Sequence, residues 1–107
     1  MADALSPVEI SVVVPMHNEE GAVATLAHEI ATALDGFAYE MIFVDDCSRD
    51  RTRQILADLK AELPQLRALS HRSNAGQSRA IASGVHAARG AIVATLDGDG
   101  QDRKSTR

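Results

Sequence analysis

The residues with the clearest chemical use lie at positions 97–101, where the sequence reads Asp-Gly-Asp-Gly-Gln. Oxygen-bearing side chains at Asp97, Asp99 and Gln101 suit a hard divalent cation such as Mg²⁺ or Mn²⁺. Two carboxylates leave coordination positions open, so a cation held here could also bind a diphosphate. An Asp-x-Asp pattern occurs in many loops, but here it directly follows an apolar run, which strengthens the prediction of a metal site.

Two other polar, acidic segments also follow apolar runs. Residues 15–20 read Pro-Met-His-Asn-Glu-Glu, and residues 45–48 read Asp-Asp-Cys-Ser. Helix capping is the alternative role for such carboxylates, and for Glu20 and Asp50 it is as well supported as ligand binding. The alternative is weaker for residues 97–101, because no helix-like apolar pattern follows them in this sequence.

The elements that would position these segments alternate along the chain. Short apolar runs, typical of strands buried in a parallel sheet, predict four strands. They span residues 10–14, 41–44, 66–70 and 91–96, with Pro15 ending the first.

Between the strands, apolar residues recur at spacings of three and four, which predicts three amphipathic helices. The first ends near Gly36, the second runs from an N-cap at Asp50 to Pro64, and the third spans residues 77–89 with Gly90 as its C-terminal cap. The residues predicted to face the core are Val23, Leu26, Ile30, Ala33, Leu34, Phe37, Ile55, Leu56, Leu59, Leu63, Ala80, Ile81, Val85 and Ala88.

The order β-α-β-α-β-α-β predicts a single α/β domain over residues 1–107, with a Rossmann-like, mainly parallel sheet and helices on its faces. Ligands bind such sheets at the carboxyl ends of the strands, so the three acidic segments should meet at one edge. Segment 15–20 lacks the G-x-G-x-x-G of a Rossmann dehydrogenase and the G-K-[ST] of a P-loop enzyme, which argues against both classes.

Composition excludes several other classes. The net charge of -4 argues against a nucleic-acid partner, and Cys47 is the single cysteine, so no internal disulfide forms. Residues 1–10 lack the basic and apolar regions of a signal peptide, and no apolar run approaches the ~18–20 residues that cross a bilayer. We therefore expect a soluble, cytoplasmic chain.

Four segments together resemble the inverting family-2 glycosyltransferases. They read VVVPMHNEE at 12–20, IFVDDCSRDRT at 42–52, NAGQS at 74–78 and LDGDGQ at 96–101, in that family's order and spacing. The resemblance covers residues 10–102. It is strongest to the branch that includes dolichol-phosphate mannose synthase and the bacterial polyprenyl-phosphate sugar transferases.

The resemblance implies the nucleotide-binding half of a GT-A fold, with strand order 3-2-1-4. It also implies transfer of a sugar from a UDP- or GDP-sugar to a polyprenyl phosphate, at the cytoplasmic face of the membrane in the full-length enzyme. The metal ligands that it implies are those already identified, with Mg²⁺ or Mn²⁺ as cofactor. The nucleotide-binding residues that it implies are Pro15, His17, Asn18, Glu19, Asp45, Asp46 and Asp97.

The sequence departs from the family at three places. His17 stands where the family usually has Tyr or Phe, and Cys47 stands where it more often has Gly. Residues 103–107 replace a proline-led helix, and we expect them to be a truncated or non-native tail. The family's catalytic base comes from later segments, so none is assigned. The alternative is a fragment that binds nucleotide and metal without catalysis, or one whose uncovered sheet edge leaves it unstable alone.

The metal prediction can be tested by calorimetry. Two carboxylates repel a diphosphate, whereas a bound divalent cation reverses the sign of that interaction. Binding of UDP or GDP should therefore require Mg²⁺ or Mn²⁺ and should be lost on Asp99→Ala. Equal affinity in excess EDTA and in Mn²⁺ would contradict the metal assignment.

Overall fold

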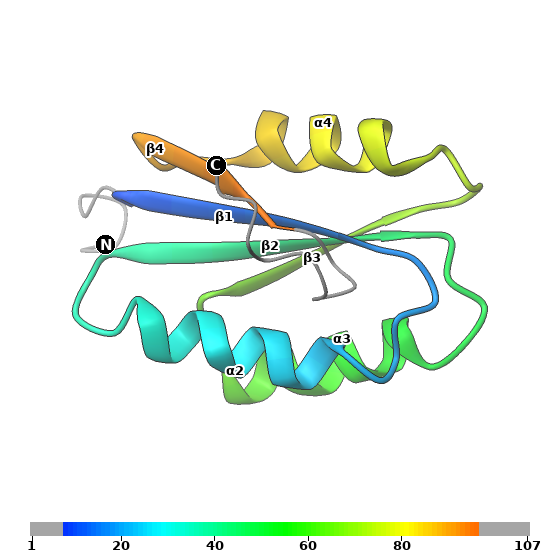
Figure 1. Ribbon diagram of the computed structural model, residues 1–107, viewed down its shortest axis with the longest axis horizontal. Coiled ribbons are helices and arrows are strands. Elements are labelled where there is room, and N and C mark those ends of the chain that lie inside the picture. Colours follow the sequence, from blue (N-terminus) through cyan, green and yellow to red (C-terminus); the bar gives the residue numbers. More distant parts are fainter. Residues whose placement is uncertain (1–7, 97–107) are drawn as a thin grey trace.

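Four parallel strands and three helices alternate along the chain in the computed structural model, which describes residues 8–96 (Figure 1). The sheet order is β3-β2-β1-β4, and all three neighbouring pairs are parallel, which confirms the predicted fold class and strand order. The predicted residues 97–101 and the tail at 103–107 lie outside the described residues. The elements are β1 (Ile10–Met16), α2 (Val23–Ala33), β2 (Tyr39–Asp46), α3 (Thr52–Glu62), β3 (Leu66–His71), α4 (Gln77–Ala87) and β4 (Ile92–Thr95).

The sheet lies between two helical layers (Figure 1). Helices α2 and α3 cover one face, and α4 covers the other. Side chains alternate between the faces along each strand. In β1, Val12 and Val14 belong to the core under α2 and α3, whereas Val13 packs with Ile42, Val44 and Ala80 under α4. None of the helices in the described part of the chain is both long and apolar enough to cross a bilayer.

Strands β1 and β2 are longer than the sequence predicted. β1 continues through Pro15 to Met16, and β2 includes Asp45 and Asp46 instead of ending before them. The backbone oxygen of Val13 accepts a hydrogen bond from the N–H of Leu96, the residue after β4. The backbone nitrogen of Pro15, two residues later in β1, therefore faces the same side, and it carries no hydrogen. The β1–β4 pairing described ends at Val13, so the proline interrupts no ladder hydrogen bond there.

Two core predictions were wrong in the first helix. α2 ends at Ala33, which is exposed, and Phe37 lies beyond the helix with 54% of its surface exposed. Between them the chain turns at Gly36, whose φ of +97° is unfavourable for other residues. The apolar spacing therefore extended past the point at which the backbone leaves the helical path.

Helix α4 contacts the sheet closely through a glycine and not through the larger Val85. Val85, predicted as core, is 43% exposed, while Gly84 is buried and a Cβ there would collide with Val13. The helix ends at Ala87 and not at residue 89, with its C-cap at Ala88. Gly90 is therefore not the cap: its N–H donates to Ser11 Oγ at 2.8 Å, in a space where a Cβ would not fit.

A buried carboxylate joins several elements at the amino end of the sheet. Glu40, 3% exposed, accepts hydrogen bonds from Ser11 Oγ at 2.6 Å, the Arg89 N–H at 2.8 Å and Arg67 Nη1 at 2.8 Å. Burial raises the pKa of Glu40, but these hydrogen bonds outweigh it and hold the pKa below its usual value. Glu40 is therefore ionised at neutral pH and ties β1, β3 and the α4–β4 connection to β2.

We predict that Glu40→Gln lowers the free energy of unfolding by about 2 kcal/mol at pH 7, because it leaves buried donors without a charged acceptor. Both arginines keep some solvent contact, which limits the loss. Because the folded-state pKa is lowered, Glu40 stabilises the fold at neutral pH, and this stabilisation disappears as the pH falls through that value. Urea unfolding at pH 7 and pH 4 measures both effects. The exposed control, Glu62→Gln, should change stability by less than about 0.5 kcal/mol at pH 7.

Candidate nucleotide site

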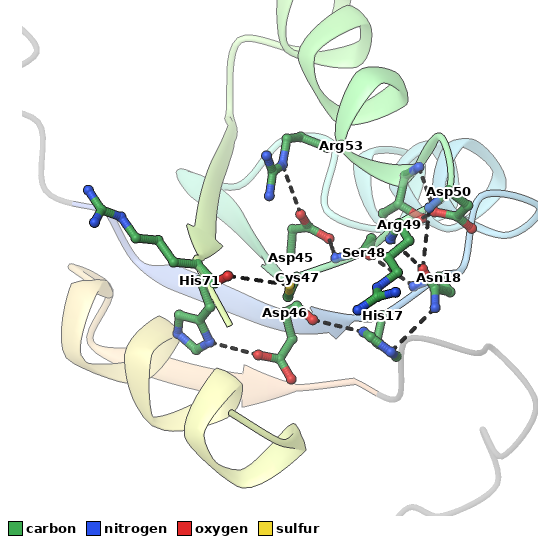
Figure 2. A network of polar contacts seen from close by, with 12 residues as sticks. His17, Asn18, Asp45, Asp46, Cys47, Ser48, Arg49, Asp50, Arg53 and His71 are labelled. Carbon is green, nitrogen blue, oxygen red and sulfur yellow. Dashed lines mark hydrogen bonds and ion pairs between the residues drawn. The ribbon is translucent and has the colours of Figure 1, made fainter. Parts of the chain in front are cut away.

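Three loops meet at the carboxyl edge of the sheet. Met16 pairs with Asp45 and Asp46 pairs with His71, so β1, β2 and β3 end level with one another. Figure 2 shows the polar side chains that follow these strands gathered in one network. The predicted convergence of residues 15–20 and 45–48 is therefore present, and β3 adds His71 to it.

Asn18 holds the loop after β1 against the loop after β2. Its N–H donates to Ser48 Oγ at 2.9 Å, and its side-chain oxygen accepts the N–H of Arg49 at 2.7 Å and that of Asp50 at 3.4 Å. Asn18 adopts a φ of +53°, a conformation that asparagine tolerates better than most residues. Asparagine therefore suits this position in two ways: it tolerates the positive φ, and its side-chain oxygen accepts the two N–H groups.

The next two residues continue the same connection. The Glu19 N–H donates to Thr52 Oγ1 at 2.9 Å, and the Glu20 N–H donates to Asp50 Oδ2 at 3.2 Å. In return, Glu20 Oε1 accepts the Arg51 N–H at 2.9 Å. Glu20 therefore caps the start of α3. The helix that follows Glu20 in the sequence is α2, so the capping crosses between two elements.

Asp50 was predicted to be the N-cap of α3, but it lies one residue before the observed N-cap. The N-cap of α3 is Arg51, yet Asp50 Oδ1 accepts the N–H of Thr52 at 2.9 Å and its hydroxyl at 2.6 Å. Burial raises the pKa of Asp50, but the hydrogen bonds from Thr52 and Glu20 outweigh it and lower the pKa overall. The carboxylate still satisfies the first turn of the helix, as capping predicts.

Asp45 and Asp46 point to opposite faces of the sheet. Asp45 is fully buried on the α2–α3 side, where its oxygens accept the Ser48 N–H and Arg53 Nε, each at 3.2 Å. Adjacent Cys47 has a φ of +61°, so the chain turns sharply straight after the strand. Through these two contacts Asp45 holds the loop after β2 from the α2–α3 side of the sheet.

Asp46 faces α4 and connects β2 to the loop after β3. Its Oδ1 accepts the Ala75 N–H and His71 Nδ1, each at 2.9 Å, and its Oδ2 accepts the Gly76 N–H at 2.8 Å. Burial raises the pKa of Asp46, but the hydrogen bonds from Ala75, His71 and Gly76 together lower it. The residue is 3% exposed, and its carboxylate is ionised at neutral pH.

The histidines occupy different environments. His17 is exposed and its Nδ1 donates to the backbone oxygen of Asp46 at 2.8 Å, next to the loop turn at Cys47. His71 lies between Asp46 and Ser83. His28 is exposed and contacts Glu62 at 2.8 Å, and His86 is exposed too.

The predicted metal ligands Asp97, Asp99 and Gln101 lie outside the described residues. Within residues 8–96, no three His, Cys, Asp or Glu side chains are grouped so as to hold a metal ion. The N–H of Leu96 donates to the Val13 oxygen at 3.0 Å, so the described end of β4 lies beside the central strand.

Sequence reasoning missed several polar residues in this network. Ser48, Thr52 and Ser83 each bond a residue far away in sequence, at 2.9 Å in every case. Hydroxyl side chains carry no pattern of their own in a single sequence. Only the sheet register, which brings the loops together, would have identified their partners.

Comparison with known proteins places this arrangement in a family. The model of glycosyl transferase family 2 matches residues 11–106, and the chain belongs to that family. A dodecaprenyl-phosphate galacturonate synthase of Rhizobium johnstonii is 36% identical over 106 residues, which cover 94% of this chain and 30% of the relative. An undecaprenyl-phosphate 4-deoxy-4-formamido-L-arabinose transferase of Pseudomonas fluorescens is 38% identical over 96 residues, covering 87% and 28%. The chain thus spans less than a third of these relatives.

Solved structures agree on the fold. S. aureus TarS 1-349 in complex with UDP-GlcNAc aligns with a TM-score of 0.76 at 29% identity, over 86% of this chain and 27% of that one. A mannosyltransferase from Pyrobaculum calidifontis, PcManGT, also aligns with a TM-score of 0.76, at 22% identity, over 87% and 29%. The fold is that of the GT-A, Rossmann-like glycosyltransferases.

We predict that Asn18→Ala destabilises the connection between the first two loops by about 1–2 kcal/mol, because it removes an acceptor and strains the backbone. Amide hydrogen exchange at Arg49 should accelerate, whereas exchange in the middle of β1 should change much less. Asn18→Asp keeps an acceptor oxygen and serves as the control. Unchanged exchange at Arg49 in Asn18→Ala would show that the contact does not hold the loops.

Proposed function

We propose that this chain binds the nucleoside diphosphate of a UDP- or GDP-sugar at the carboxyl edge of its sheet, as the donor half of a sugar transferase. The observation that carries the proposal is the convergence of the loops after β1, β2 and β3 into one polar network, in a chain of glycosyl transferase family 2. In an open α/β sheet this edge is where ligands bind.

The predicted nucleotide residues that the structure describes differ in exposure, and so in the part that each can take. His17 and Asn18 are exposed and Glu19 is half-buried, so they can meet a ligand directly. Pro15 and Asp45 are buried and would act by holding the surface in place. Asp46 uses Oδ2 for Gly76 and Oδ1 for two donors, which leaves acceptor capacity on Oδ2 for an N–H of the base.

A bound diphosphate needs positive charge nearby, but carboxylates outnumber arginines in the loops after β1 and β2. We assign this role to Mg²⁺ or Mn²⁺ held by Asp97, Asp99 and Gln101, with Asp97 also near the nucleotide. A divalent cation would neutralise the negative charge that develops on the departing nucleoside diphosphate. The choice of cation class follows from the oxygen ligands alone.

The acceptor that we propose for the whole protein is a polyprenyl phosphate. Both curated relatives named above carry a polyprenyl phosphate in their names, at 36% and 38% identity. TarS, at 29% identity, has been solved with UDP and with UDP-GlcNAc, which favours a uridine nucleotide as donor. The acceptor is anionic already, so such a reaction needs no base to deprotonate a hydroxyl; the protein must instead position the phosphate in line with the anomeric carbon.

Nucleotide binding by the chain tests this proposal. Titration calorimetry with UDP and GDP in Mn²⁺ should show saturable binding, and Asp46→Ala should weaken it by about 1.5–3 kcal/mol because a charge-assisted hydrogen bond is lost. Asp58→Ala is the control, since it removes an exposed carboxylate of α3 that contacts only Gln54 among the partners described. Equal affinity of Asp46→Ala and the parent would remove Asp46 from the site.

A further inference from the structure

His71 links the nucleotide edge to α4 through two hydrogen bonds. Its Nδ1 lies 2.9 Å from Asp46 Oδ1, and its Nε2 lies 2.9 Å from Ser83 Oγ. We propose that His71 and Ser83 are positioning residues of the nucleotide site, which hold Asp46 and, through it, the backbone of residues 75–76. The proposal rests on the proposed function, because it assigns these residues a part in nucleotide binding.

The sheet register explains why the histidine occupies this place. His71 is the parallel partner of Asp46, so both side chains project from the same face of the sheet, toward α4. The side chains of His71 and Asp46 are 19% and 5% exposed. In this partly desolvated position a hydrogen bond to an ionised carboxylate is stronger than it would be at the surface.

The proton positions follow from the charges. An ionised Asp46 can only accept hydrogen bonds, so Nδ1 of His71 must carry a proton. In the neutral ring Nε2 is then an acceptor, and the Ser83 hydroxyl donates to it. Asp46 therefore selects the tautomer of His71 that carries its proton on Nδ1, and the Ser83 hydroxyl, which can donate or accept, donates to Nε2 and holds the ring in that orientation.

Asp46, held by His71, in turn holds residues of two loops. Its carboxylate holds the N–H groups of Ala75 and Gly76 at the start of α4, and its backbone oxygen holds His17 after β1. Gly76 has a φ of +95°, so the loop makes a sharp turn at the point that Asp46 holds. A change at Ser83, which lies within α4, would thus reach the nucleotide edge through His71 and Asp46.

Three variants of the full chain test the proposal by nucleotide affinity. His71→Phe should weaken Mn²⁺–UDP or Mn²⁺–GDP binding by about tenfold, as expected for one charge-assisted hydrogen bond. His71→Asn can still donate to Asp46 and should recover most of that loss. Ser83→Ala should weaken binding less than His71→Phe. His28→Phe is the matched control, because His28 of α2 makes a similar contact with Glu62 of α3 at 2.8 Å, and these helices cover the opposite face of the sheet from α4.

Two readouts judge the positioning separately from the nucleotide. Long-range ¹H–¹⁵N spectra should show the Nδ1–H tautomer of His71 in the parent, and the Nε2 resonance should shift in Ser83→Ala, where the hydroxyl that donates to it is lost. Exchange of the Ala75 and Gly76 amides should accelerate in His71→Phe and stay unchanged in His28→Phe. Unchanged exchange of these amides would overturn the proposal even where nucleotide binds. If the amides respond but the parent chain binds no nucleotide, the proposed function fails, and with it the assignment of these residues to a nucleotide site.

Discussion

Asp46 accepts two backbone N–H groups and an imidazole at the point where β2 leaves the sheet. An ionised carboxylate on a residue that is only 3% exposed needs such partners, because burying an unpaired charge costs several kcal/mol. Those partners belong to β3 and to the loop that begins α4, and His17 bonds the backbone oxygen of the same residue. One buried charge thus fixes how three strand ends face one another, and the shape of the candidate site depends on it.

A second buried carboxylate does similar work at the other end of the same face. Glu40 joins β2 to Ser11, Arg67 and the backbone of Arg89, so α4 is tied to the sheet beyond its last turn as well as at its first. Between these two charges the contact is close and apolar, with Gly84 against Val13. The α2–α3 face relies mainly on a larger apolar core. Two buried, ionised carboxylates therefore hold the α4 face, and one of them, Asp46, is a proposed nucleotide contact.

The sequence was sufficient for the order of elements, the parallel sheet and the edge at which the polar loops meet, because apolar periodicity and strand ends depend on local patterns. It failed where tertiary structure overrides the pattern. Phe37 follows the helical spacing of apolar residues, but the backbone turns at Gly36 and leaves its side chain exposed. Val85 is exposed because α4 contacts β1 through Gly84, where the helix and the strand are too close for a side chain. The partners of Asp46 could not be predicted either, since His71 and Ser83 acquire their roles only from the sheet register and the packing of α4.

The most direct test of this account is a map of amide chemical-shift changes when the chain is titrated with UDP or GDP in Mg²⁺, the diamagnetic cation. The account predicts the largest changes in residues 17–20, 46–52 and 72–76, where the three loops form one network. It predicts small changes around Ser11, Glu40 and Arg89 at the opposite end of the sheet. Saturable changes centred on that opposite end, with the three loops unaffected, would contradict it.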